Sequence, residues 1–269
     1  MKSKIKIYIY SIILLILIVV SIVASNKQGE TMKTNSEVTL SNIKIEWGIK
    51  RGDNHEQPDL GSKNRQLIEK YNGMAMGNKE SENIYVTFDL GYEAGYTENI
   101  LDTLKENNVP AAFFITAHYV NTASDLVQRM INDGHIIGNH TVNHKSMPNI
   151  SEAELEKELM NLHTVIYEKF NYEMKYMRPP KGEYSERSLN TTIKLGYIPV
   201  MWSFAYADWD ETKQPSYQEG IDKIIKNAHN GEIMLLHATS KTNMEILDTV
   251  IKQIKDRGYK FKSLDEFVK

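Results

Sequence analysis

The amino-acid sequence predicts an α/β fold built on a parallel sheet, and two observations support this prediction. From Ile84 to the C-terminus, short apolar runs alternate with longer amphipathic stretches, the pattern of strands joined by crossover helices. Titratable residues follow several of the apolar runs, and in a parallel sheet these positions share one edge. The pattern fits an open doubly wound sheet and a (β/α) barrel equally, because both gather chemistry at the carboxyl ends of their strands.

The alternation also sets the expected order of the elements. Strands are predicted at residues 84–89, 111–115, 135–138, 197–200 and 233–236. Amphipathic helices are predicted at residues 97–107, 124–133, 151–170, 217–228 and 243–257. Ser151, followed by acidic residues, marks a helix start. Before this regular region, we expect a short strand at 43–47 and a helix within 59–76, where apolar residues recur at helical spacing.

The first residues have the pattern of a targeting segment. Three lysines within the first six residues precede an uncharged run from 7 to 24, as in an export signal. The run is also close to the length of a membrane span, so an uncleaved anchor in the membrane is the alternative. We therefore expect a signal peptide or anchor at 1–25, a linker at 26–42, an N-terminal extension packed on the main domain at 43–83, and the main domain at 84–269.

Composition excludes several classes of function. The chain has 269 residues with 41% hydrophobic and 25% charged content, as in an ordinary globular protein. Its net charge is only −3, and no basic patch interleaves with aromatic residues, so no nucleic-acid partner is expected. Cysteine is absent, which excludes disulfides and thiolate-bound zinc; any metal must use histidine, carboxylate or backbone oxygen ligands.

Asp89 and the segment His140-Thr-Val-Asn-His144 carry the strongest chemical signal. Asp89 ends a β-branched and aromatic run, where it is either a turn former or a general base. The two histidines are spaced so that their imidazoles can bind one metal ion, although each is equally compatible with a structural role. A zincin helix is excluded, because Thr141 stands where that motif has its catalytic glutamate. A carboxylate beside a histidine pair predicts metal-assisted hydrolysis.

Three further segments combine a stiff or apolar stretch with a titratable group. Arg178-Pro-Pro-Lys-Gly182 is a rigid loop that would aim Arg178 at a carboxylate. The aromatic segment 202–209, which contains Asp208, is either a core strand with a terminal turn or a wall on which a sugar ring stacks. His237 ends an apolar run; it is either a structural histidine or, if paired to Asp208, a protonated general acid.

Five blocks in this order resemble the polysaccharide deacetylases of the NodB-homology type, carbohydrate esterase family 4. They read Thr87-Phe-Asp-Leu-Gly91, His140-Thr-Val-Asn-His144, Arg178-Pro-Pro-Lys-Gly182, Asp208-Trp209 and Leu235-Leu-His237. Five ordered blocks are far more specific than any single motif. The resemblance, which covers residues 84–269, implies a distorted (β/α) barrel and a hydrolase that acts on a linear amide, removing acetyl groups from a polysaccharide.

The resemblance also implies roles for single residues. Asp89 would be the catalytic base, held in place by Arg178. His237 would be the acid, tuned by Asp208. The substrate-binding residues would be aromatic or proline side chains around these groups, namely Tyr92, Pro180, Trp202 and Trp209.

One departure from the family pattern concerns the metal. His140 and His144 would bind a divalent cation, zinc or similar, but Leu90 stands where the family has an aspartate as third ligand. Two imidazoles fall short of the three protein ligands typical of catalytic zinc. We therefore expect a weakly held metal, completed by water or by Glu93, and tighter binding if Leu90 is replaced by aspartate.

The run from Thr87 to Thr97 further resembles the δ-lactam-forming de-N-acetylases of endospore cortex, as do residues 45–48 and 67–71. Those enzymes deacetylate N-acetylmuramic acid that has lost its peptide stem, and the freed amine closes onto the lactyl carboxylate. This implies an exported enzyme of sporulation that acts on peptidoglycan glycan strands. Two alternatives stay open: an N-acetylglucosamine deacetylase of peptidoglycan or chitin-like polymers, and a non-catalytic glycan-binding wall protein.

Overall fold

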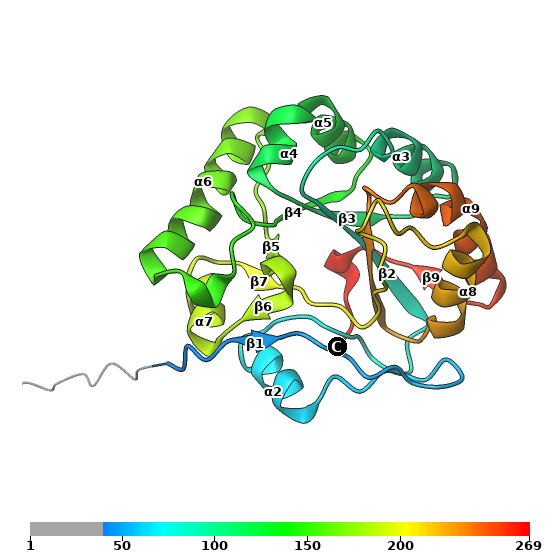
Figure 1. Ribbon diagram of the computed structural model, residues 1–269, viewed down its shortest axis with the longest axis horizontal. Helices are drawn as coiled ribbons and strands as arrows, with labels where there is room; N and C mark the ends of the chain where they lie inside the picture. The colour runs from blue at the N-terminus through cyan, green and yellow to red at the C-terminus, as the bar shows by residue number, and fades with distance from the viewer. Residues whose placement is uncertain (1–39) are drawn as a thin grey trace, which may run out of the picture. The chain divides into compact units, whose positions relative to one another are not determined.

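The computed structural model describes residues 40–269, and a parallel sheet lies at the centre of the unit Ser41–Lys269 (Figure 1). The sheet has seven strands in the order β7-β5-β4-β3-β2-β8, with β9 paired to β2. The strands are β2 (Asn83–Leu90), β3 (Ala111–Ile115), β4 (Ile136–Asn139), β5 (Tyr176–Met177), β7 (Ile198–Pro199), β8 (Glu232–His237) and β9 (Lys260–Phe261). Every pairing between them is parallel.

Helices α3 to α6, α8 and α9 lie around the outside of the curled sheet (Figure 1). The α-helices are α2 (Ser62–Lys70), α3 (Thr97–Glu106), α4 (Ala117–Thr122), α5 (Ser124–Asn132), α6 (Glu152–Phe170), α7 (Glu186–Lys194), α8 (Tyr217–Asn227) and α9 (Lys241–Asp256). Residues 40–269 also contain three short 3₁₀ turns: η1 (Met147–Asn149), η2 (Pro180–Gly182) and η3 (Leu264–Glu266).

The sheet curls into a distorted (β/α) barrel, which confirms the fold that the family resemblance implies and excludes the open doubly wound sheet. Between β7 and β8 the regular ladder is replaced by single bridges. Met74 pairs with Val200, and Phe204 pairs with Met234. Irregular backbone therefore completes this side of the barrel.

Strand β2 shows how alternation builds the two sides of the sheet. Phe88 and Leu90 belong to the large apolar cluster between sheet and helices, whereas Tyr85 belongs to a second buried cluster. Since side chains alternate along a strand, Thr87 and Asp89 share the face of Tyr85 and Leu90 lies on the opposite face. Leu90 is fully buried there.

The segment before β2 packs against the loop region that follows β5. Strand β1 (Ile45–Glu46) pairs antiparallel with β6 (Glu183–Tyr184). Trp47 shares a buried cluster with Tyr71 and Tyr184, and its indole Nε1 donates to the carbonyl of Trp202 at 2.9 Å. These contacts place the N-terminal segment behind one wall of the predicted site.

Most of the predicted elements are present, with corrected bounds. Strand β3 and the start of α6 agree with the sequence prediction, and the Ser151 hydroxyl caps α6 by accepting from the Glu154 amide. The helix expected within 59–76 covers only Ser62–Lys70, because the left-handed residue Asn72 (φ 52°) follows it closely. The strand expected at 43–47 is only β1, and α4, α7, β5, β6 and β9 were not predicted.

The predicted signal or anchor at 1–25, and the linker as far as residue 39, lie outside the described residues. Within residues 40–269, no helix combines the length and the apolar character that a membrane span requires.

Candidate active site

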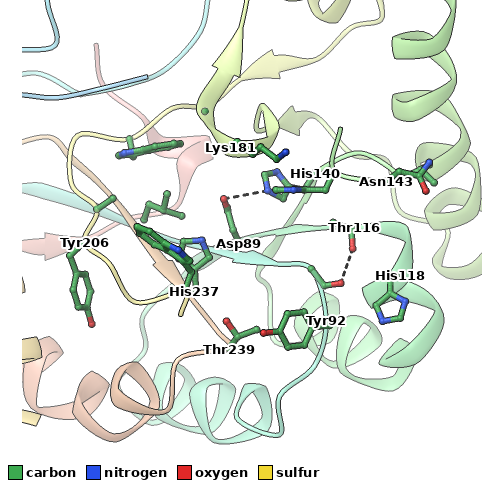
Figure 2. A pocket seen from close by; sticks show the side chains of 18 residues that line it. Asp89, Tyr92, Thr116, His118, His140, Asn143, Lys181, Tyr206, His237 and Thr239 are labelled. Atoms are coloured by element: carbon green, nitrogen blue, oxygen red, sulfur yellow. Dashed lines mark hydrogen bonds and ion pairs between the residues drawn. The ribbon is translucent and has the colours of Figure 1, made fainter. Parts of the chain in front are cut away.

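A cavity of about 760 Å³ opens at the carboxyl ends of the strands. This volume is in the range typical of sites for small molecules. Figure 2 shows Asp89 and His140 pointing toward one another within it, with Lys181 beside His140. The predicted site residues that line the cavity are Asp89, Tyr92, His140, His144, Trp202, Trp209 and His237.

Asp89 is held by Arg178, as the rigid-loop hypothesis anticipated. The Arg178 Nη1 donates to Asp89 Oδ1 at 2.7 Å. The other guanidinium nitrogens are also satisfied: Nη2 donates to Thr87 Oγ1 at 2.9 Å and Nε to the Val200 carbonyl at 3.1 Å. The guanidinium carbon lies 4.2 Å from the centre of the Phe114 ring. Because Arg178 is fully buried, these contacts fix its position and direct its charge at Asp89.

The charges around Asp89 determine its ionisation. Burial alone would raise the pKa of this carboxyl, but the Arg178 guanidinium, and after it the imidazoles of His140 and His237, outweigh burial, and the pKa lies below its ordinary value. Asp89 is therefore a carboxylate at neutral pH and an acceptor for protons.

His140 and His144 lie on a loop that brings their rings together, with centroids 4.8 Å apart. The His140 Nδ1 donates to the Arg178 carbonyl at 2.9 Å, which leaves Nε2 as the lone-pair nitrogen, 3.5 Å from Asp89 Oδ2. This arrangement, one ring nitrogen bound to a backbone carbonyl and the other free, is typical of metal-ligating histidines. Burial, and then the neighbouring His140, lower the pKa of His144 to about 4, so its ring is neutral, as a metal ligand must be.

The third ligand proposed from the sequence is not found among residues 40–269, where no group of three or more side chains has the arrangement of a metal site. Glu93 is excluded, because its carboxylate accepts from the Gly95 amide at 2.6 Å, the Tyr119 hydroxyl at 2.9 Å and the Thr97 amide, the first of α3, at 3.3 Å. Leu90 faces the outer apolar cluster instead of the cavity. The residues present thus suit two imidazole ligands with solvent, and not a tight three-ligand zinc site.

His237 ends β8 on the other side of the cavity and is paired with Asp208. Its Nδ1 donates to Asp208 Oδ1 at 2.8 Å, and its backbone N–H donates to Oδ2 at 2.8 Å. Burial alone would lower the pKa of His237, but the Asp208 carboxylate outweighs burial and raises it. The shift therefore favours the protonated form of His237.

Sequence reasoning missed Asn243, which completes this pair from helix α9. Its side-chain amide donates to Asp208 Oδ2 at 2.6 Å and to the His237 carbonyl at 3.1 Å. Asn243 is almost fully buried. The available signal was a polar amide on the apolar face of a predicted amphipathic helix, a position that requires a hydrogen-bond partner.

The predicted substrate-binding residues divide into two groups. Tyr92, Trp202 and Trp209 line the cavity, and Trp209 is 58% exposed. Pro180 is buried and does not line the cavity, so its predicted contact with substrate gains no support from the structure. Its two successors do line the cavity, because the left-handed backbone of Lys181 (φ 60°) turns the chain into the cavity wall.

Position 182, which ends this turn, requires glycine. Its φ is 66°, and a Cβ there would lie 2.7 Å from the ring of Trp202 and 3.1 Å from the Cβ of Trp47. Both the backbone angle and the packing therefore exclude a larger residue. The loop is held in one conformation between the N-terminal segment and the cavity.

Comparison with known proteins shows which family the chain belongs to. The polysaccharide deacetylase family matches residues 76–200. The chain is 42% identical to the peptidoglycan-N-acetylmuramic acid deacetylase PdaA of Bacillus subtilis, over 85% of this chain and 88% of the relative. It is 30% identical to a peptidoglycan-N-acetylglucosamine deacetylase of Bacillus cereus, over 73% of this chain and 72% of the relative.

Comparison with solved structures leads to the same family. The structure of Bacillus subtilis PdaA, a family 4 carbohydrate esterase, matches with a TM-score of 0.83 and 41% identity, covering 85% of this chain and 98% of the other. The family inferred from five short blocks is thus confirmed over most of the chain. The protein belongs to the polysaccharide deacetylases of carbohydrate esterase family 4.

Proposed function

We propose that this protein is an exported peptidoglycan N-deacetylase that removes the acetyl group from N-acetylmuramic acid lacking its peptide stem, as a step to muramic δ-lactam in spore cortex. The observation that carries the proposal is that Asp89 and His237 are register partners in neighbouring strands and line the same cavity. The similarity to PdaA over 85% of the chain supports the choice of sugar. Action on the cell wall agrees with the export signal expected at the N-terminus.

The site residues supply a base and an acid on opposite sides of a reacting amide. Asp89, kept ionised by Arg178, takes a proton from water as the oxygen attacks the acetamide carbonyl. When the C–N bond breaks, protonated His237 gives its proton to the departing amine. Acetate and a free amino sugar are the products, and Asp208 keeps His237 oriented with its Nε2 toward the reacting group.

A divalent cation, acting as a Lewis acid, is compatible with this scheme. Deacetylases of this family are generally metal-dependent. His140 and His144 would hold the ion through their ring nitrogens, weakly because residues 40–269 place no third protein ligand beside them. When bound, such an ion supplies Lewis acidity, which compensates for the low basicity of Asp89.

Lys181 offers a physical reason for selecting a substrate without a stem. It lines the cavity, and its charge reaches His144, whose pKa it lowers. The lactyl group of stem-free muramic acid is a carboxylate, which an ammonium group can pair with, whereas a stem peptide makes this position a neutral and bulky amide. The alternative is that Lys181 is only a solvated surface lysine.

The test is acetate release from three substrates under one set of conditions: stem-free glycan strands, stem-bearing strands and chitin oligomers. The proposal expects the highest kcat/KM on the stem-free strands. The variant Lys181→Met should raise KM for these strands alone, and Lys194→Met, an exposed lysine on α7, is the matched control. Equal rates on chitin oligomers would favour an N-acetylglucosamine deacetylase, and no acetate from any substrate would favour a glycan-binding wall protein.

A further inference from the structure

Glu158 is a buried carboxylate outside the cavity, on the apolar face of helix α6. This face is formed by Leu155, Leu159, Leu162 and Ile166. Glu158 is only 4% exposed. A charge at such a position is costly unless its oxygens are hydrogen-bonded, so its partners reveal what it does.

All of its partners belong to the loop between His140 and His144 or directly follow it. Glu158 Oε2 accepts from the Asn143 backbone N–H at 2.7 Å, and Oε1 accepts from the Asn143 side-chain amide at 2.7 Å. The Glu158 backbone carbonyl accepts from the Val142 N–H at 3.1 Å. The Lys145 ammonium lies 3.5 Å from Oε1.

This loop has a backbone that needs external support. Thr141 and His144 both have left-handed conformations, with φ of 66° and 54°. Such conformations, unfavourable above all for a β-branched residue, persist only where surrounding contacts determine them. Within the loop, the His144 N–H donates to Thr141 Oγ1 at 3.0 Å. The Thr141 N–H donates to Asn139 Oδ1 at 2.8 Å, and Glu158 supports the rest of the loop through Val142 and Asn143.

We propose that Glu158 is a positioning residue that holds this loop so that the imidazole of His144 faces His140 and Asp89. The proposal rests on the proposed function for the use of the site, and it adds a residue that touches neither substrate nor reacting atoms. Without the carboxylate, two donors of Asn143 lose their acceptors and the strained backbone relaxes. His144 then leaves its place beside His140, and both metal binding and turnover suffer.

The decisive variant is Glu158→Leu, because leucine suits the apolar face of α6 and preserves folding. It should lower kcat on stem-free strands about 10–100-fold and weaken Zn²⁺ binding by a similar factor, the usual cost of losing support behind a metal ligand. The effect on kcat should exceed that on KM, since Glu158 itself does not line the cavity. Amide exchange should accelerate at residues 141–145, while α6 stays protected.

Two further variants separate positioning from packing. Glu158→Gln should retain most of the activity, because its carbonyl oxygen accepts from the Asn143 N–H and its amide donates to a flipped Asn143 side chain. Glu154→Leu, one turn earlier on α6 and paired with Lys145 at the surface at 2.7 Å, should behave as wild type.

Unchanged kcat, Zn²⁺ affinity and loop exchange in Glu158→Leu would overturn the proposal, as would losses that spread with faster exchange through all of α6. The failure of the proposed function is distinguishable from this result. If the wild-type protein released no acetate from any glycan, the proposed function would fall, whereas loop exchange and Zn²⁺ affinity of Glu158→Leu would still decide the role of Glu158.

Discussion

Asp89 and His237 are register partners in the parallel strands β2 and β8. Neighbouring strands lie roughly 4.8 Å apart, so the two side chains flank one small volume at the mouth of the barrel. Each has its own buried partner, Arg178 for Asp89 and Asp208 for His237, and the partners move the two pKa values in opposite directions from their ordinary values. Two groups whose environments drive them to opposite protonation states are suited to act as base and acid.

Asp89→Asn should remove the base and leave the fold. We expect kcat/KM for deacetylation to fall about 10²–10⁴-fold, the usual contribution of a general base. The asparagine oxygen can still accept from Arg178, but the buried guanidinium loses its counter-charge, so the free energy of unfolding should fall as well. Steady-state kinetics and denaturant titration measure the two effects. Wild-type turnover in the folded variant would remove Asp89 from the mechanism.

The pH dependence of kcat should report the protonation state of His237. Its pKa is raised in the folded protein, so the protonated form required for acid catalysis is present below the raised pKa and is lost as pH rises through it. Asp208→Asn removes the charge responsible, and the basic limb of the kcat profile should move to lower pH. The stability that this pair contributes should likewise be lost as pH rises. A basic limb that does not move would separate Asp208 from His237.

Metal dependence should be real but weak. Among the described residues only His140 and His144 are placed as ligands, so prolonged chelation should lower the activity and excess divalent metal should restore it. The measurement is acetate release before and after chelation, with His140→Ala as the comparison. If activity survives chelation and also survives this substitution, the histidine pair does not serve as a metal site.

Leu90→Asp should destabilise the protein without tightening zinc binding, in contrast to the tighter binding expected from the sequence. Because Leu90 is buried in the apolar cluster outside the sheet, a carboxylate there would be unpaired and should cost about 3–5 kcal/mol of unfolding free energy. The control Leu90→Met should cost less than about 1.5 kcal/mol. Denaturant unfolding gives the stabilities, and calorimetric zinc titration gives the affinities. Tighter zinc binding in Leu90→Asp would show that position 90 can reach the metal.

The sequence predicted the strands of the barrel well where their apolar runs were long. Strand β3 was located to the residue, and the apolar run 197–200 marked β7, whereas β5 and β9 have only two residues each and are defined by pairing that no local pattern reveals. The error at position 90 had a different origin. Motif spacing placed Leu90 beside Asp89, but strand alternation turns it to the other face.

The candidate site was predicted as far as its motifs reach. Most of the residues that line the cavity lie within short recognisable blocks, as do Arg178 and Asp208, but Thr116, His118 and Thr239 lie outside them. Glu158 and Asn243 were missed, because each lies inside a helix and acts through long-range hydrogen bonds. Only a polar residue at an apolar helix position marked them, and that signal does not name a partner.

The most direct test of the central claim is mass spectrometry of a defined stem-free glycan strand after incubation with the purified protein. The account predicts the loss of one acetyl group per muramic acid residue, located by fragmentation, and no loss with Asp89→Asn. An acetyl loss located on glucosamine residues, or an unchanged strand, would contradict it.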